Sequence, residues 1–234
     1  NFFNPGFATD NNLSFSGGGE KTAFYLGLNA VNSNSVFPGD KDVYNRYNVR
    51  FNGTAEFSNK FSAGIALTYS KINSNQVAGG QSNGSVFDNV LQTPRDIPLD
   101  QLGDLNNKYY GYGIVTADGV RRNDLYGYYG AYSFNPYYVL EKYDNFNDVN
   151  RITGNFNIGY KPTEWLTISE RLGVDFYNDR RRLLAPKYNF LPADEAGNYS
   201  ADNTQASNGS YQIDEFNVNE VTHDLMVTAN TYDE

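Results

Sequence analysis

The sequence predicts an all-β fold, an antiparallel up-and-down segment of a transmembrane β-barrel with long extracellular loops. Seven stretches alternate apolar and polar residues, as strands with one apolar face do. Aromatic residues make up 16% of the 234-residue chain and glycine occupies 22 positions, a composition that suits strands and turns. Short and long connections alternate strictly between the stretches, which is typical of outer-membrane barrels with short periplasmic turns.

The alternation of apolar and polar residues places the strands along the chain. It is clearest in 24–30, where every even-numbered residue is apolar, and it returns in 47–52 and 152–160. We expect the seven strands at about 10–17, 21–33, 44–57, 61–73, 148–161, 165–180 and 215–231.

The connections fix the order of these strands. Gly17-Gly18-Gly19-Glu20 joins the first pair, where glycine permits positive φ. Ser58-Asn59-Lys60 and Lys161-Pro162-Thr163-Glu164 join two further pairs with turn-forming residues. The remaining connections are long, at about 34–43, 74–147 and 181–214. In a meander, alternate connections lie at opposite ends, so we expect all the tight turns at one end and all the long loops at the other.

Aromatic residues border two of the tight turns. Phe57 and Phe61 flank one of them, and Tyr160 and Trp165 flank the other. Rings in these positions predict the interfacial girdle of a membrane barrel. A soluble β-sandwich or β-solenoid is the alternative, but a compact soluble domain rarely holds a structureless loop of about 70 residues.

Two positions disturb the pattern. Glu170 falls on the same face as Leu172, where a carboxylate would meet lipid unless a local bulge turns it away. In the last strand Phe216 is even-numbered whereas Leu225 is odd-numbered, so we expect a bulge near Glu220.

Composition narrows the class of protein further. The net charge of −9 disfavours nucleic acid as a partner, and the absence of cysteine excludes disulfides and thiolate metal sites. No stretch approaches the roughly 20 apolar residues of a membrane helix. The chain opens without a signal-peptide pattern, and seven is an odd number for a single-chain barrel. We therefore expect a piece of a larger barrel whose other strands and plug domain lie outside this chain.

Several short motifs resemble SusC/RagA-type TonB-dependent transporters of the outer membrane. They occur in the order typical of that family and cover most of 10–180, thinning through 181–234. The segment 91–98 is similar to a family loop motif that more often has two adjacent prolines. The motifs are 14–22, 47–52, 91–98, 135–140, 150–155 and 164–167.

The resemblance implies a plugged barrel of 22 strands in the bacterial outer membrane. It also implies coupling to the TonB complex and a SusD-like surface lipoprotein that closes over the extracellular side. The usual cargo of such transporters is oligosaccharide, and in some members peptide. No catalytic residues and no cofactor are expected, and the fitting function is active import of oligosaccharides or peptides. A passive porin and a soluble extracellular glycan-binding β-domain are the alternatives.

Two sets of residues are candidate contact sites. Tyrosine offers a flat apolar ring and a hydroxyl at low entropic cost, so the tyrosine-rich part of the second long loop could contact cargo or a partner protein, or pack within the loop. That set comprises Tyr109, Tyr110, Tyr112, Arg121, Arg122, Tyr126, Tyr128 and Tyr129. The second set is Arg180 and Arg182, which by parity point outward where a strand leaves the membrane. There they could bind lipopolysaccharide phosphates or remain a solvated charge run.

Other motifs carry less chemistry. Residues 17–22 contain glycines followed by Lys21-Thr22, but Glu20 interrupts the phosphate-loop pattern and a strand follows, so a hairpin turn is expected. Acidic groups at 40–42 and 194–195 lack the spacing of an EF-hand, which leaves calcium in the extracellular loops as an alternative to no metal. His223 has no triad or metal-ligand pattern around it.

Overall fold

The computed structural model describes residues 2–82, 84–93, 95, 98–105, 134–189 and 206–230. Seven antiparallel strands form one sheet in the order β1-β2-β3-β4-β5-β6-β9. Each strand therefore pairs with the next one along the chain, except that β6 pairs with β9 because the short strands β7 and β8 between them form a separate sheet. The strands are β1 (Ala8–Gly18), β2 (Thr22–Asn34), β3 (Val43–Ser58), β4 (Phe61–Asn75), β5 (Asp144–Thr163), β6 (Leu166–Ala185) and β9 (Ser210–Ala229).

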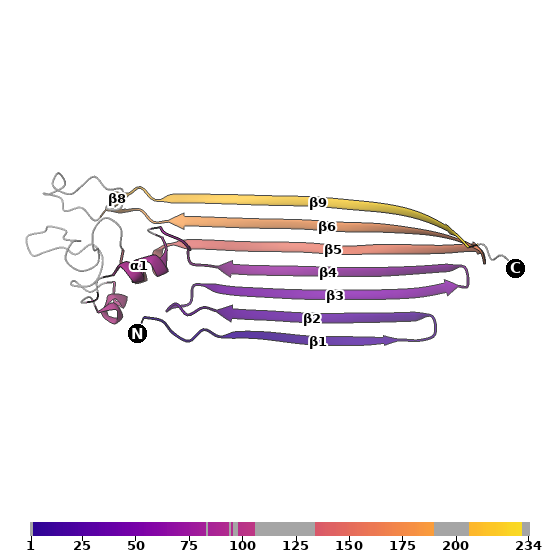
Figure 1. Cartoon of the computed structure of the whole chain (residues 1–234), viewed down its shortest axis with the longest axis horizontal. Helices are drawn as coiled ribbons and strands as arrows, with labels where there is room; N and C mark the ends of the chain where they lie inside the picture. Colours follow the sequence, from indigo (N-terminus) through magenta and orange to yellow (C-terminus); the bar gives the residue numbers. More distant parts are fainter. Residues whose placement is uncertain are drawn as a thin grey trace, which may run out of the picture.

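The sheet is an up-and-down meander with two different ends. The three tight turns, at 19–21, 59–60 and 164–165, lie at one end, and the long connections lie at the other (Figure 1). Within the third long connection, β7 (Tyr188–Asn189) and β8 (Ala206–Ser207) pair as a separate two-stranded antiparallel sheet. The predicted fold class is confirmed, because a strand occupies each of the seven expected places and the connections alternate as expected.

The register between strands gathers the apolar side chains on one side of the sheet, here called the apolar face. Leu28 lies opposite Val49, Val49 opposite Tyr69, and Tyr69 opposite Ile152. Most of these side chains are exposed even though they are large and apolar. Other exposed members of this face are Leu13, Phe15, Phe24, Phe51, Ile65, Leu67, Phe156, Leu172, Phe176, Val221, Leu225 and Val227. An exposed apolar surface of this extent requires another apolar phase or a partner to cover it.

The apolar side chains form a belt of limited height. The apolar belt runs from Phe61 to Tyr69 in β4 and from Ile152 to Tyr160 in β5, about nine residues in each strand. At about 3.3 Å per residue and a tilt of about 40°, a belt of nine to eleven residues is about 20–25 Å high, close to the apolar band of a membrane barrel. Just beyond Tyr69 and Ile152 polar residues enter the same face, where Tyr69 donates a hydrogen bond to Asn150 (2.9 Å).

The opposite side of the sheet, here called the polar face, carries a ladder of hydrogen bonds between strands. Asn29 donates to Asp10 (2.6 Å) and to Asn12 (2.8 Å), and Asn48 donates to Asn29 (2.8 Å). These hydrogen bonds give the side-chain amides partners on the neighbouring strands and help to fix the register of β1, β2 and β3.

The bulge expected near Glu220 is absent, and so is the bulge considered as an alternative at Glu170. β6 and β9 pair without interruption from Leu166–Ala229 to Ala185–Ser210, and β5 and β6 shift register only between Tyr160 and Thr163, next to the turn. Glu170 therefore does lie on the apolar face. Its carboxylate is paired with the imidazole of His223 at 2.8 Å, and this neighbour replaces the bulge as the way to accommodate the charge.

Phe216 lies on the polar face for a different reason than the expected bulge near Glu220. This part of β9 extends past the apolar belt, so its alternation no longer separates apolar from polar residues. The ring of Phe216 is covered by the guanidinium group of Arg181, whose Cζ is 5.0 Å from the ring centroid.

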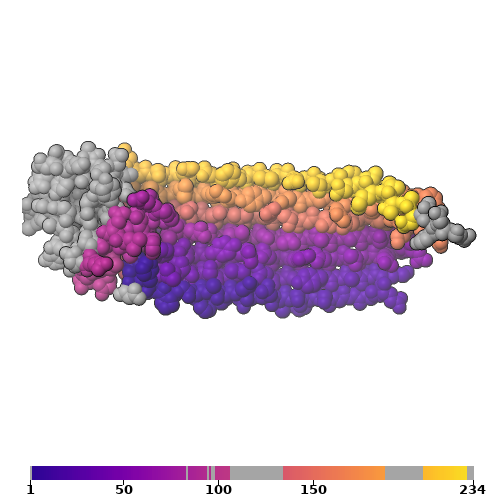
Figure 2. Space-filling model, in the orientation of Figure 1, coloured from indigo at the N-terminus to yellow at the C-terminus, as the bar shows by residue number. Residues whose placement is uncertain are grey.

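The second long connection is partly helical, which the sequence reading treated as loop. It contains α1 (Val86–Gln92), the 3-10 helix η1 (Leu99–Gly103) and α2 (Pro136–Lys142). In the space-filling view the strands form one continuous wall, and α1 and the start of the chain gather at its long-loop end (Figure 2). Within the described residues, no helix has the length and apolar content to cross a membrane.

Candidate binding surface at the long-loop end

Two short helices at the long-loop end are held in place by buried side-chain amides. Ser85 caps α1 by accepting from the backbone N–H of Asp88 (3.3 Å), and Asn135 caps α2 by accepting from Tyr137 (2.9 Å). The buried side chain of Asn135 also donates to the carbonyl of Leu102 in η1 (3.0 Å). Asn89 of α1 is fully buried and accepts from the backbone N–H of Phe134 just before α2.

An aromatic cluster fills the space between these helices and the start of the chain. Phe2 packs edge-on against Tyr137, with ring centroids 5.0 Å apart, and Phe134 packs edge-on against Tyr138 at 6.5 Å. The buried members of the cluster are Phe2, Val86, Phe134, Tyr138, Val139 and Leu140. The described residues of the second long connection thus form a small packed cap with its own core.

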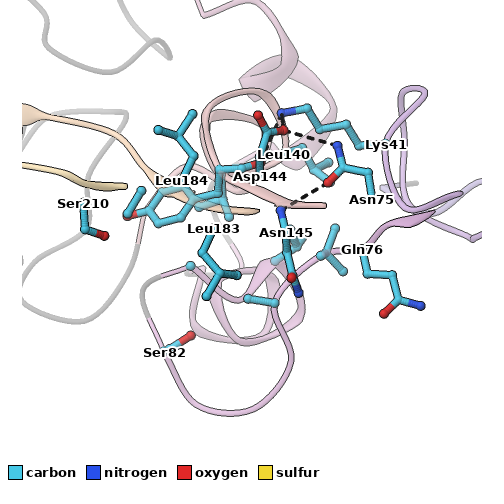
Figure 3. Close-up of a pocket in the computed structure, with 17 residues that line it drawn as sticks. Lys41, Asn75, Gln76, Ser82, Leu140, Asp144, Asn145, Leu183, Leu184 and Ser210 are labelled. Carbon is cyan, nitrogen blue, oxygen red and sulfur yellow. Dashed lines mark hydrogen bonds and ion pairs between the residues drawn. The ribbon is translucent and has the colours of Figure 1, made fainter. Parts of the chain in front are cut away.

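A pocket of about 260 Å³ lies between this cap and the ends of β4, β5 and β6 (Figure 3). Leu140 of α2 and Leu183 and Leu184 of β6 line its apolar part. Its polar edge is an ion pair between Lys41 and Asp144 at 2.9 Å. The volume suits a single apolar side chain or a small ring with one polar edge.

The ion pair also ties the first long connection to the cap. Lys41 donates to the carbonyls of Glu141 (2.7 Å) and Tyr143 (3.1 Å) at the end of α2. Partial burial alone would raise the pKa of Asp144, but hydrogen bonds from Lys41 and Asn75, together with the charges of Lys41 and Arg182, outweigh it and hold the pKa below its ordinary value. Asp144 is therefore ionised at neutral pH and keeps Lys41 in place.

Tyr137 in the same cap is shifted in the other direction. Burial raises the pKa of its hydroxyl, and the nearby charge of Asp100 raises it further. Tyr137 consequently stays a neutral hydrogen-bonding group over the physiological range.

The polar face contributes a charged wall next to this end. Arg151 binds Asp175 through two nitrogens, at 2.9 Å for Nε, and Arg181 binds the buried Asp179 at 2.7 Å. Tyr177 donates to the same carboxylate at 2.8 Å. A hollow of about 670 Å³ opens beside this wall, lined by Arg50, Thr68, Arg171, Asp175, Glu220 and Asp224 among others.

Of the two predicted sets of contact residues, one lies within the described residues. Arg180 and Arg182 are exposed and lie opposite Asp148 and Phe146 in the β5–β6 register, on the same side of the sheet as Phe176. The other set, Tyr109, Tyr110, Tyr112, Arg121, Arg122, Tyr126, Tyr128 and Tyr129, lies outside the described residues. Contact of either set with cargo, partner or lipid stays a prediction.

One of the acidic positions considered for calcium, Asp42, has another partner in the structure. Lys41 separates Asp40 from Asp42, and Asp42 accepts a hydrogen bond from the backbone N–H of Val77 (3.2 Å). Across the described ranges, no group of three or more His, Asp or Glu side chains is placed to hold a metal ion. The acidic pair at 194–195 lies outside these ranges.

Comparison with solved structures identifies the same fold in a known transporter. The chain is similar to the RagAB peptide importer in its "open-open" state, with a TM-score of 0.56 and 16% identity. The "closed-closed" state gives 0.54 and 15%, and a further RagAB peptide transporter structure gives 0.51 and 17%. No protein-family model matches the sequence, and the comparison with curated proteins finds no match.

The structural alignment covers almost all of this chain but only part of the solved chain. The alignment with the first RagAB structure covers 97% of this chain but 30% of the solved chain. The chain therefore spans less than a third of the length of that structure, and it has the fold of one arc of it. The sequence resemblance to SusC/RagA-type transporters and the likeness of fold agree.

Proposed function

We propose that this chain is part of the wall of an outer-membrane active importer. The importer would take up oligosaccharides or peptides, draw energy from the TonB complex and work with a SusD-like surface lipoprotein. The observation that carries the proposal is the likeness of fold to the RagAB peptide importer over nearly the whole chain. The sheet supports the proposal, because its apolar belt is about as high as the apolar band of a membrane barrel and its other face is polar.

The long-loop end would face the outside of the cell in this arrangement. Its cap, with buried amides and an aromatic core, is a rigid surface on which a surface lipoprotein or cargo could rest. No bond-making chemistry is needed for this role. Because the similar structures are those of a peptide importer, peptides are the first cargo class to test and oligosaccharides the second.

Energy-coupled uptake tests the proposal. In cells that make the full-length protein containing this chain, we expect labelled peptides or oligosaccharides to accumulate at least about tenfold above cells lacking it. A protonophore or loss of TonB should abolish the difference, because both remove the energy that displaces a plug.

Two results would contradict an active importer. Uptake that persists without TonB would indicate a passive porin. A full-length protein recovered from the membrane-free fraction without detergent would indicate a soluble glycan-binding domain.

A further inference from the structure

Two arginines stand on the apolar side of the sheet just beyond the apolar belt. Arg180 is four residues past Phe176, the last apolar member of the belt in β6, and Arg182 is two residues further. At about 3.3 Å per residue, Arg180 lies about 13 Å beyond the belt edge along the strand. If the belt spans the hydrocarbon, this position falls in the outer-leaflet headgroup layer.

Alternate arginines of β6 have different partners. Arg181, on the polar face, is bound to the buried carboxylate of Asp179. In the described part of the chain, neither Arg180 nor Arg182 forms an ion pair and both are exposed, although Arg182 is near enough to Asp144 for its charge to help lower the pKa of that carboxylate. Arg182 is held against the sheet by Phe146, whose ring centroid is 5.2 Å from the guanidinium carbon.

The carboxylates nearest to Arg180 in the sheet are already engaged. Its neighbours in register are Asp148 and Glu215. Asp148 is bound to Lys71, and Glu215 accepts a hydrogen bond from Asn178 at 3.1 Å. Arg180 and Arg182 thus present two guanidinium groups, two residues apart on one face, to an anion from outside the protein.

We propose that Arg180 and Arg182 bind the phosphate groups of lipopolysaccharide in the outer leaflet, and this rests on the proposed outer-membrane location. A guanidinium group pairs with phosphate through two parallel hydrogen bonds, which gives both strength and orientation. Below the arginines, Phe176 and Leu172 continue the same column of β6 and would contact the acyl chains of the same lipid. The site therefore combines phosphate recognition with an apolar wall, a combination that free phosphate cannot exploit.

Binding of lipid A to the purified full-length protein tests this site. We expect the Arg180→Gln/Arg182→Gln variant to bind lipid A at least about tenfold more weakly than the wild type. The matched control is Arg50→Gln/Arg171→Gln, which removes the same charge from the polar face and should change the affinity less than about twofold. Should the first variant fold poorly, Arg180→Lys/Arg182→Lys keeps the charge and should weaken binding by about two- to fivefold, because lysine cannot bind bidentately.

Three results with lipid A would overturn the proposal. These are unchanged lipid A affinity in the Arg180→Gln/Arg182→Gln variant, equal loss in the control, and equal binding of lipid A from which the phosphates have been removed. Inorganic phosphate that competes as well as lipid A would likewise replace the lipid site by a simple anion site. Uptake by the wild type is measured separately, so a failed importer proposal and a failed lipid site give different results.

Discussion

The Glu170–His223 pair shows how a single polar contact can sit within an apolar surface. Glu170 lies opposite Ile158 on one side and Leu225 on the other, one row in from the tight-turn edge of the apolar belt. The sequence showed that Glu170 falls on this face, but it could not supply the partner. His223 lies 53 residues further along the chain, and only the register of β6 with β9 brings the two together.

Removing one member of this pair should be worse than removing both. In full-length protein, Glu170→Leu or His223→Leu alone leaves one polar group facing lipid, and each should lower the free energy of unfolding by about 1–2 kcal/mol. The double variant should be close to the wild type, because no polar group is left without its partner. Equilibrium unfolding of the three variants in lipid bilayers measures the coupling.

The control for this cycle is Asp224→Asn, beside His223 but on the polar face. It should change the free energy of unfolding by less than about 0.5 kcal/mol. Strictly additive effects of the two leucine substitutions would show that the pair has no coupling in the membrane.

At the scale of elements, the sequence predicted strands well inside the apolar belt and less well outside it. The expected strand 148–161 is observed as Asp144–Thr163, and 165–180 as Leu166–Ala185. The strands continue past the belt because backbone pairing persists there, whereas apolar and polar residues no longer separate between the two faces, as Leu183 and Leu184 on opposite faces show. Periodicity therefore reports the height of the belt rather than the length of the strand.

The helices of the second long connection were missed although their ends carry signals. Ser85 three residues before Asp88, and Asn135 directly before Pro136, are both typical of a helix start. α1 and α2 have only seven residues each, too short for a recognisable 3.6-residue period. Their stability comes from the contacts of Asn89 and Asn135 with segments far along the chain, which a local pattern cannot reveal.

Loss of the Asn135 side chain should loosen α2 without unfolding the sheet. Asn135→Ala removes the acceptor for the backbone N–H of Tyr137 and the donor to the carbonyl of Leu102, which should destabilise the packed cap of the second long connection by about 1–3 kcal/mol. Faster amide hydrogen exchange in 136–142, with unchanged exchange in β5, is the expected result in full-length protein. Asn208→Ala, at an exposed asparagine, should leave both rates unchanged. Equal protection of α2 in both variants would show that Asn135 does not hold the helix.

At the scale of the whole molecule, the two faces of the sheet have different chemistry. The apolar face has a belt of membrane height, and the polar face has fixed hydrogen-bond ladders and ion pairs that tolerate water. The cap at the long-loop end is built on the strands that project beyond the belt. If the chain is part of the proposed importer, the apolar face would contact lipid and the polar face would line the interior, with each property carried by different side chains of the same strands.

This division predicts that substitution by arginine destabilises the protein on one face of β4 and has little effect on the other. Ile65 is in the middle of the apolar belt, and Thr68 lines the hollow on the polar face three residues along the same strand. In full-length protein, Ile65→Arg should destabilise the folded state in bilayers by about 2–4 kcal/mol, because a guanidinium group at the bilayer midplane loses its hydration. Thr68→Arg should change the stability by less than about 1 kcal/mol, because the hollow of about 670 Å³ has room for the side chain and carboxylates beside it. Reversible urea titration in vesicles gives both values, and each variant is the control for the other. If the two arginines cost the same, the apolar face does not contact lipid, and the exposed belt must instead be covered by protein.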